Sequence, residues 1–250
     1  AAYKLAKKFS AKLIFEVRDL WPLTLIELGR YSKFNPLIWL MQRAEDFAYR
    51  RSDKVVSLLP HAQQYMVDRG MLSDKFIYVP NGIAIEEGNT KVLSAQNANT
   101  IKKLKAKGYF LVCYAGNLGH ANDLETLLYS LSELRNVHAV IVGDGVNKAK
   151  LISLVKELKL GDKVHFLPKI EKCEVHALLE SVDVCYLGLV DSPVYRYGVS
   201  PTKMNDYLLA RKPVIFVSNA EFESVESVSS CNAGSVEEVV EVLQALRQLP

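Results

Sequence analysis

A lysine and an aspartate three residues apart, Lys203 and Asp206, lie in the stretch 200–215, which predicts a short helix followed by a strand. Ser200 is the expected N-cap and Pro201 the expected first helical residue. Both charges should lie on one helix face, because residues three apart are neighbours there. Free N–H groups at the helix start and the lysine favour a phosphate, and the aspartate can accept from sugar hydroxyls. The alternative is an ordinary amphipathic helix with a solvated ion pair.

A glycine-flanked turn from Gly116 to His120 is a second candidate for phosphate binding. It follows an apolar run at 109–115, expected to be a strand, and precedes a helix expected at 123–134. Backbone N–H groups in such a turn can approach a diphosphate. Glycine occurs only at its first and fourth positions, and no acidic residue closes the following strand. The pattern therefore lacks the GxGxxG fingerprint of a nicotinamide dinucleotide site.

A polar pair and a tryptophan, Arg18, Asp19 and Trp21, follow an apolar run at 12–17 that is expected to be a strand. In parallel α/β sheets, ligands bind beyond the carboxyl ends of the strands. These residues are therefore candidates for a cleft loop. The alternative is a simple exit turn, in which Asp19 and Pro22 serve as turn residues.

Short apolar runs alternate with segments of helical periodicity along the chain. This order, with short connections, predicts an α/β fold of doubly wound parallel sheets. Strands are expected at 12–17, 54–59, 76–79, 109–115, 139–142, 164–167, 182–189 and 214–217. Between 84 and 107 the chain becomes polar and loses its periodicity, which predicts a linker between two domains.

The composition is that of a soluble globular protein. The chain has 250 residues, of which 49% are hydrophobic and 24% charged, enough for one large or two ordinary domains. A net charge of +3 gives no indication of a nucleic-acid partner. No apolar run is long enough to span a membrane. The four cysteines show no CxxC spacing and are expected to be free thiols, with Cys113 and Cys185 buried in strands.

A basic helix with apolar residues at helical spacing is expected at 36–52. Its Trp39 and its arginines would suit an anionic membrane surface. The favoured alternative is that the helix packs its apolar face on its own sheet.

Five motifs in order resemble the group 1 glycosyltransferases of family GT4, and the resemblance covers nearly the whole chain. They lie at 16–22 (EVRDLWP), 79–82 (VPNG), 114–119 (YAGNLG), 142–145 (VGDG) and 201–207 (PTKMNDY). The most similar members are bacterial enzymes of the fucosamine-transferase type. The resemblance implies the GT-B architecture, in which two Rossmann-like domains face each other and the C-terminal one binds the nucleotide sugar.

The resemblance also implies a division of the chain. Residues 1–83 would be the C-terminal half of the acceptor-side domain, 84–107 the linker, and 108–250 the donor-binding domain without its last helices. The chain would then be truncated at both ends relative to the family.

The site residues that the resemblance implies fall into two groups. On the donor side, the glycine turn lies under the diphosphate, Lys203 and the helix start meet the phosphates or the sugar, Asp206 meets the ribose and Ile170 the base. The full donor-binding set is Gly116, Asn117, Leu118, Gly119, His120, Gly143, Ile170, Pro201, Thr202, Lys203 and Asp206. The acceptor-side residues are Arg18, Asp19 and Trp21, and the catalytic ones Lys203, Asp206 and Arg18. No metal is expected.

Two positions depart from the family pattern. Gly198 stands in place of the first glutamate of the E-x7-E pair, which leaves Asp206 as the second member. His120 follows the glycine turn where an arginine or lysine often stands. Subgroups with PxKxxEY-like motifs often lack the first glutamate.

The implied activity is retaining transfer of a sugar from a nucleotide donor, expected to be UDP-linked, to a lipid-linked or saccharide acceptor in O-antigen, capsule or exopolysaccharide synthesis. The expected location is the cytoplasm, with peripheral contact to the inner membrane, and no cofactor is expected. Front-side attack is the expected mechanism. The alternatives are an inactive fragment that binds nucleotide sugar and a Rossmann-fold oxidoreductase.

Overall fold

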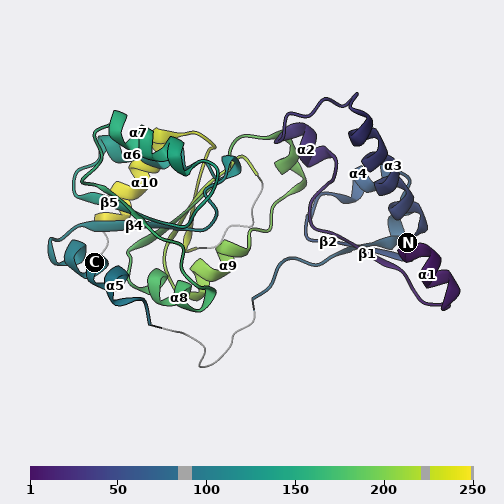
Figure 1. The fold of residues 1–250 in the computed structure, drawn as a ribbon, viewed down its shortest axis with the longest axis horizontal. Coiled ribbons are helices and arrows are strands. Elements are labelled where there is room, and N and C mark those ends of the chain that lie inside the picture. The colour runs from purple at the N-terminus through teal and green to yellow at the C-terminus, as the bar shows by residue number, and fades with distance from the viewer. Residues whose placement is uncertain (84–91, 221–225, 249–250) are drawn as a thin grey trace. The chain divides into compact units, whose positions relative to one another are not determined.

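The computed structural model describes residues 1–83, 92–220 and 226–248, and its elements form two compact units (Figure 1). The first unit contains residues 1–81 and the returning segment Ser192–Ser200. The second contains Gly82–Asp191, Pro201–Asn219 and the described part of the C-terminal segment.

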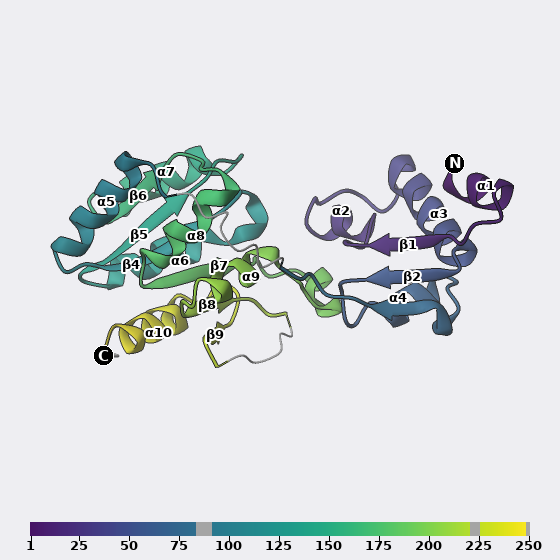
Figure 2. The ribbon, with the colours of Figure 1, turned by 90° about the horizontal axis from the view of Figure 1, so that it is seen from below.

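The first unit is built on a three-stranded parallel sheet in the order β1-β2-β3 (Figure 2). Its core is formed by Val17 and Val55 of the sheet, Tyr49 of α3 and Met66 of α4. Helix α3 packs on its own sheet through Tyr49, but the expectation that its apolar face packs there is wrong, because Leu37, Leu40 and Phe47 of that face are exposed. The elements are α1 (Ala2–Lys8), β1 (Ile14–Val17), α2 (Leu23–Glu27), α3 (Pro36–Arg51), β2 (Lys54–Ser57), α4 (Gln63–Asp68) and β3 (Phe76–Tyr78).

The segment Ser192–Ser200 belongs to the first unit by its contacts, although the expected division placed it in the donor domain. The N–H of His61 donates to the carbonyl of Tyr197 (3.1 Å), and the Tyr197 ring lies 5.4 Å from that of Tyr65. Asn81 donates its N–H to Ser200 Oγ (2.9 Å) and its Nδ2 to the Ser200 carbonyl (2.6 Å). A short 3-10 helix, Pro193–Tyr197, lies within the segment.

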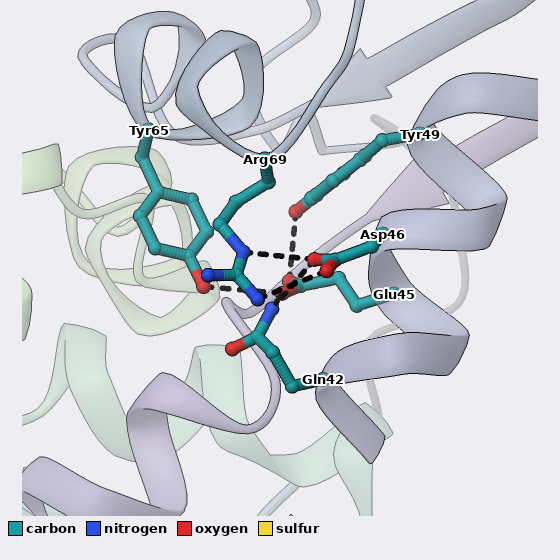
Figure 3. A network of polar contacts seen from close by, with 6 residues as sticks. All are labelled: Gln42, Glu45, Asp46, Tyr49, Tyr65 and Arg69. Atoms are coloured by element: carbon teal, nitrogen blue, oxygen red, sulfur yellow. Dashed lines mark hydrogen bonds and ion pairs between the residues drawn. The ribbon is translucent and has the colours of Figure 1, made fainter. Parts of the chain in front are cut away.

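A polar network joins α3 to α4 (Figure 3). The buried Glu45 carboxylate accepts from Tyr49 Oη (2.8 Å), Gln42 Nε2 (2.7 Å) and Tyr65 Oη (3.1 Å). Arg69 instead pairs with Asp46 through Nε (2.8 Å) and Nη2 (3.1 Å). Burial raises the pKa of Glu45, because the charged carboxylate loses its hydration.

The second unit is a six-stranded parallel sheet in the order β6-β5-β4-β7-β8-β9, with helices on both faces (Figure 1). Helices α6, α7 and α10 cover one face, and α5, α8 and α9 the other. The elements are α5 (Ala95–Ala106), β4 (Phe110–Ala115), α6 (Leu124–Glu133), β5 (Val137–Val142), α7 (Lys148–Glu157), β6 (Val164–Leu167), α8 (Lys172–Glu180), β7 (Val184–Gly188), α9 (Thr202–Leu209), β8 (Val214–Val217), β9 (Val228–Cys231) and α10 (Val236–Gln248).

The central strands are apolar on both faces, as a sheet covered by helices on each side requires. Every residue of β5 is buried, and the cysteines at positions 113 and 185 are buried free thiols, as predicted. Burial raises the pKa of the Cys185 thiol to about 12.

The prediction that 84–107 is a linker is wrong for its second half, because Ala95–Ala106 forms α5. Ser94 caps the helix by accepting from the N–H of Asn97 (3.4 Å), and Ile101 and Leu104 are buried at a spacing of three. These two buried apolar residues dock the helix, and its other face is solvated. The first part of the predicted linker, 84–91, lies outside the described residues.

The carboxyl ends of β4 and β5 are adjacent, since Ala115 is paired with Val142. The N–H of Gly116 donates to the carbonyl of Val142 (2.9 Å). A Cβ at Gly143, whose φ is +140°, would lie 1.9 Å from the carbonyl oxygen of Gly116. The two backbone segments can therefore lie this close only with glycine at 143.

Replacement of Glu45 by Gln should change how the stability of the first unit depends on pH. A carboxyl with a raised folded pKa adds stability below its unfolded pKa of about 4.3, and this contribution is lost as pH rises through the folded pKa. Between these values, wild-type stability should fall relative to that of Glu45→Gln. Urea unfolding followed by tryptophan fluorescence measures this, since Trp21 and Trp39 both lie in the first unit. Parallel pH profiles for the two proteins would contradict the assignment.

Gly143→Ala should destabilise the second unit by at least about 2 kcal/mol, since it adds a clash and a strained φ. Gly161→Ala is the matched control, because a Cβ there meets no atom within 4 Å. Urea unfolding followed by far-UV circular dichroism should show an earlier transition for Gly143→Ala alone, while tryptophan fluorescence, which reports the first unit, stays unchanged. Equal stability of the two variants would show that the turn relaxes at no cost.

Candidate functional site

A pocket of about 370 Å³ lies at the carboxyl ends of the central strands of the second unit. It collects residues from the β4 and β5 exits, from the loop after β6 and from α8 and α9, as parallel α/β sheets commonly do. The lining residues are Ala115, Gly116, Asn117, Val142, Gly143, Asp144, Lys169, Ile170, Lys172, Val175, Lys203 and Asp206.

The turn that forms one wall is held by a tyrosine and an asparagine. Tyr114 Oη donates to the carbonyl of Asn117 (2.7 Å), and Asn122 Nδ2 donates to the same carbonyl (3.0 Å). The N–H of Leu118 donates to the carbonyl of Asp144 (2.8 Å). The turn is therefore fixed from both sides before any ligand binds.

Lys203 reaches this turn from α9. Its Nζ donates to Asn122 Oδ1 (3.3 Å) and lies 5.3 Å from the centre of the Tyr114 ring. Its Cε would lie 2.2 Å from a Cβ at Gly116, where φ is +155°, so the glycine provides the space that the lysine occupies. Burial lowers the pKa of Lys203, because the ammonium group loses hydration.

Two buried residues of α9 fix the direction of this lysine. Met204 and Tyr207 pack against the sheet, and Tyr207 Oη accepts from the N–H of Ala115 (3.4 Å) and donates to the carbonyl of Tyr186 (3.3 Å). Helix α9 is thus anchored to the end of β4 and the middle of β7, and the face that carries Lys203 is directed toward the pocket.

The predicted cap of α9 is wrong. The helix begins at Thr202 with Pro201 as its N-cap, and no side chain caps it. Ser200 does not serve this helix, because its Oγ accepts from the N–H of Asn81 instead.

Asp206 pairs with Lys172, the first residue of α8, and not with Lys203. Lys172 Nζ lies 2.5 Å from each of the two Asp206 carboxylate oxygens. The solvated pair within one helix, considered as the alternative from the sequence, is therefore not what these two residues form. Lys203 and Asp206 line the same pocket but bind partners on different elements.

The pocket brings together six of the predicted donor-side residues, namely Gly116, Asn117, Gly143, Ile170, Lys203 and Asp206. Leu118 lies in the apolar core and His120 is exposed in the short 3-10 helix His120–Asn122. The pocket lining does not include these two residues, nor does it include Gly119, Pro201 or Thr202. Whether any of the set contacts a donor stays a prediction.

The predicted acceptor-side residues Arg18, Asp19 and Trp21 line a pocket of about 440 Å³ in the first unit. Glu45 and other α3 residues form its opposite wall. Burial and the negative charge of Asp19 together raise the pKa of Tyr195 to about 12.

Sequence reasoning missed Asn122, Asp144, Lys169, Lys172 and Val175. The last three lie in the loop after β6 and in α8, where only Ile170 had been singled out. The signal available was the pair of lysines that flank Ile170 at the carboxyl end of a predicted strand. Asn122 gave no signal, because its contact with Lys203 depends on how α9 packs.

Comparison with known proteins connects this site to one family. Residues 96–218 match the family model described as Glycosyl transferases group 1. Over 211 residues the chain is 23% identical to the probable glycosyltransferase WbjE of Pseudomonas aeruginosa. This match covers 82% of this chain and 51% of WbjE. The chain thus spans about half the length of this curated relative.

Two solved structures share the fold. Anabaena HepE, crystallised with UDP and glucose, superposes with a TM-score of 0.74 at 16% identity over 98% of this chain and 64% of HepE. WaaG, a glycosyltransferase involved in lipopolysaccharide biosynthesis, gives a TM-score of 0.67 at 14% identity over 98% of this chain and 71% of WaaG. These likenesses confirm the predicted α/β fold with its similarity to GT-B glycosyltransferases. Residues 96–218 are therefore similar to the glycosyl transferases group 1 family.

Proposed function

We propose that the chain is part of a retaining glycosyltransferase that moves a sugar from a UDP-linked donor to a lipid-linked or saccharide acceptor during synthesis of a bacterial surface polysaccharide. The observation that carries this proposal is the half-buried Lys203 ammonium beside the turn at Gly116. The pocket around it, of about 370 Å³, has the size of a small-molecule site. The UDP in the HepE structure and the biosynthetic role of WaaG support the choice of donor and pathway class.

The proposed chemistry stabilises a departing diphosphate. As the bond between the sugar and the nucleotide breaks, negative charge develops on the diphosphate oxygens. The Lys203 ammonium and the N–H of Asn117 would stabilise that charge without a metal or cofactor, since the N–H groups of Gly116 and Leu118 already donate to Val142 and Asp144. Because the turn is held by Tyr114 and Asn122 before ligand binds, it needs no rearrangement at the moment of reaction.

For the acceptor step we propose front-side attack by a hydroxyl, with a diphosphate oxygen taking its proton. A covalent nucleophile of the retaining-glycosidase kind uses two carboxylates placed on either side of the bond. In the pocket of the second unit, which is the donor pocket of this proposal, Asp144 and Asp206 are paired with Lys148 and Lys172. Arg18, Asp19 and Trp21 would act on the acceptor side, from the pocket of the first unit.

Within this family we place the chain with the fucosamine-transferase-like enzymes. The motif at 201–207 supports this, and so does the backbone at Gly198, in place of the first glutamate of the family pair. Gly198 has φ of +89°, and a Cβ there would lie 2.5 Å from Cδ of Pro60. No glutamate fits that position without moving the chain.

We further propose a cytoplasmic protein with peripheral contact to the inner membrane. Helix α3 exposes Leu37, Trp39 and Leu40, and the Arg43 guanidinium lies 4.7 Å from the Trp39 ring. Such a face suits the interface of an anionic membrane. Among the residues that the structure describes, no helix has the length and apolar character to cross a bilayer.

Two alternatives to this function can be distinguished by which ligand the chain binds and whether it forms product. A fragment that only binds nucleotide sugar would bind UDP but form no product with a lipid-linked acceptor. A Rossmann-fold oxidoreductase would be stabilised by NADH and not by UDP in a thermal-shift experiment. The incomplete glycine pattern already counts against the second alternative.

Lys203→Met should weaken UDP binding by at least about tenfold, since a charge-assisted hydrogen bond in a half-buried site is lost. Wild-type affinity should also fall as pH rises from about 7.5 to about 10, because burial lowers the pKa of Lys203 and only its protonated form binds the diphosphate. The UDP affinity of Lys203→Arg should depend less on pH over this range than that of wild type, because arginine stays charged. Isothermal titration calorimetry measures all three.

The UDP phosphates are fully ionised in this range, because their last pKa is about 6. The uracil ring also loses a proton near the alkaline end of this range, and it does so with every variant, so only the decline that wild type shows in excess of Lys203→Arg reports Lys203. Wild-type affinity for the Met variant, or the same alkaline decline in the Arg variant, would remove Lys203 from the site.

A further inference from the structure

The contact between Lys172 and Asp206 is unusual for an ion pair at a protein surface. The Lys172 side chain is 75% exposed, whereas that of Asp206 is 18% exposed. Holding a long exposed lysine in one position costs side-chain entropy, and exposed pairs add little to stability. Yet the ammonium lies 2.5 Å from both oxygens of one carboxylate, which fixes the plane of that carboxylate.

This pair lies in the wall of the donor pocket. Lys172 and Asp206 both line it, and Lys172 follows Ile170 by two residues. One turn earlier on α9, Lys203 is directed at the turn of Gly116. Along the pocket wall, the phosphate-binding cation and the carboxylate are therefore separated by one helical turn, with Lys172 on the side of the carboxylate that leads to the loop after β6.

A carboxylate in this place is suited to accept from the vicinal hydroxyls of a ribose. Two ionised oxygens offer about four acceptor positions, so an ammonium on both oxygens leaves acceptor positions open on each. A free carboxylate would rotate about its last bond, and a ligand would have to pay the cost of orienting it. An ammonium that contacts both oxygens has already imposed one orientation.

We propose that Lys172 is a positioning residue that orients Asp206 for the ribose hydroxyls and so makes the pocket select ribonucleotides over deoxyribonucleotides. The inference rests on the proposed function, because it needs a nucleotide in this pocket. If Lys172 instead contacted the diphosphate directly, its replacement would weaken the binding of ribonucleotides and deoxyribonucleotides alike.

The test compares UDP with its 2′-deoxy analogue by isothermal titration calorimetry, using the whole chain. Wild-type protein should bind UDP about tenfold more tightly than 2′-deoxy-UDP, since the deoxy ligand leaves an acceptor of Asp206 unpaired. Lys172→Met should reduce that ratio to less than about threefold, while Lys172→Arg, which keeps a cation with several donors, should restore most of it.

Lys169→Met is the matched control, because Lys169 lines the same pocket while Asp206 is held by Lys172. It should weaken the binding of UDP and of 2′-deoxy-UDP to the same extent, so that the ratio of the two affinities stays as in the wild type. Lys172 is exposed, so its replacement should leave the far-UV circular dichroism spectrum unchanged.

The outcomes separate the inference from the function on which it rests. If Lys172→Met binds both nucleotides more weakly but keeps the wild-type ratio of UDP to 2′-deoxy-UDP affinity, the positioning role is overturned. The proposed nucleotide site would still stand. An equal loss of the ratio in Lys169→Met would also overturn it, since the effect would then be one of charge alone. A wild-type chain that binds neither UDP nor 2′-deoxy-UDP would overturn the proposed function and the inference together.

Discussion

The fit of Lys203 into the space left by Gly116 is the contact on which the donor pocket depends. An ammonium group that leaves water needs compensation, and here it donates one hydrogen bond to Asn122 Oδ1 and lies near the face of the Tyr114 ring. Those partners are neutral, so burial still lowers the pKa of Lys203. A diphosphate would supply the negative charge that these neighbours do not. The same geometry that makes the lysine costly to bury therefore makes the pocket favourable for an anion.

Much of this arrangement could be predicted from the sequence, because it is set by local rules. Buried parallel strands appear as continuous apolar runs, and glycine after a strand marks a close backbone approach. These rules located β4, β5 and the turn at Gly116, and the spacing of Lys203 and Asp206 placed both on α9. The spacing could not predict which residues bind Lys203 and Asp206. Lys172 and Asn122 are distant in sequence from α9 and reach it only through packing.

Two of the errors in the predicted secondary structure have a common cause, which is that tertiary contacts override a local preference. Ser200 is a good N-cap by residue type, yet its hydroxyl is used by Asn81, and α9 starts without a side-chain cap. The segment 95–106 is too polar to predict a helix, yet Ile101 and Leu104 dock it on the second unit. In both cases the deciding contact lies outside the window from which the prediction was made.

The charges that line the donor pocket then determine which ligand it suits. Three lysines and two aspartates line it, and Lys172 is committed to Asp206. Asp144 lies 3.7 Å from Lys148 of α7, which offsets its charge. The positive charge that remains is therefore carried by Lys169 and Lys203, on the loop after β6 and on α9. Two cations on the pocket wall match a diphosphate better than a neutral sugar, while the paired Asp206 offers acceptors for hydroxyls. The pocket thus combines the two chemistries that a nucleotide sugar contains, and α9 carries one residue for each.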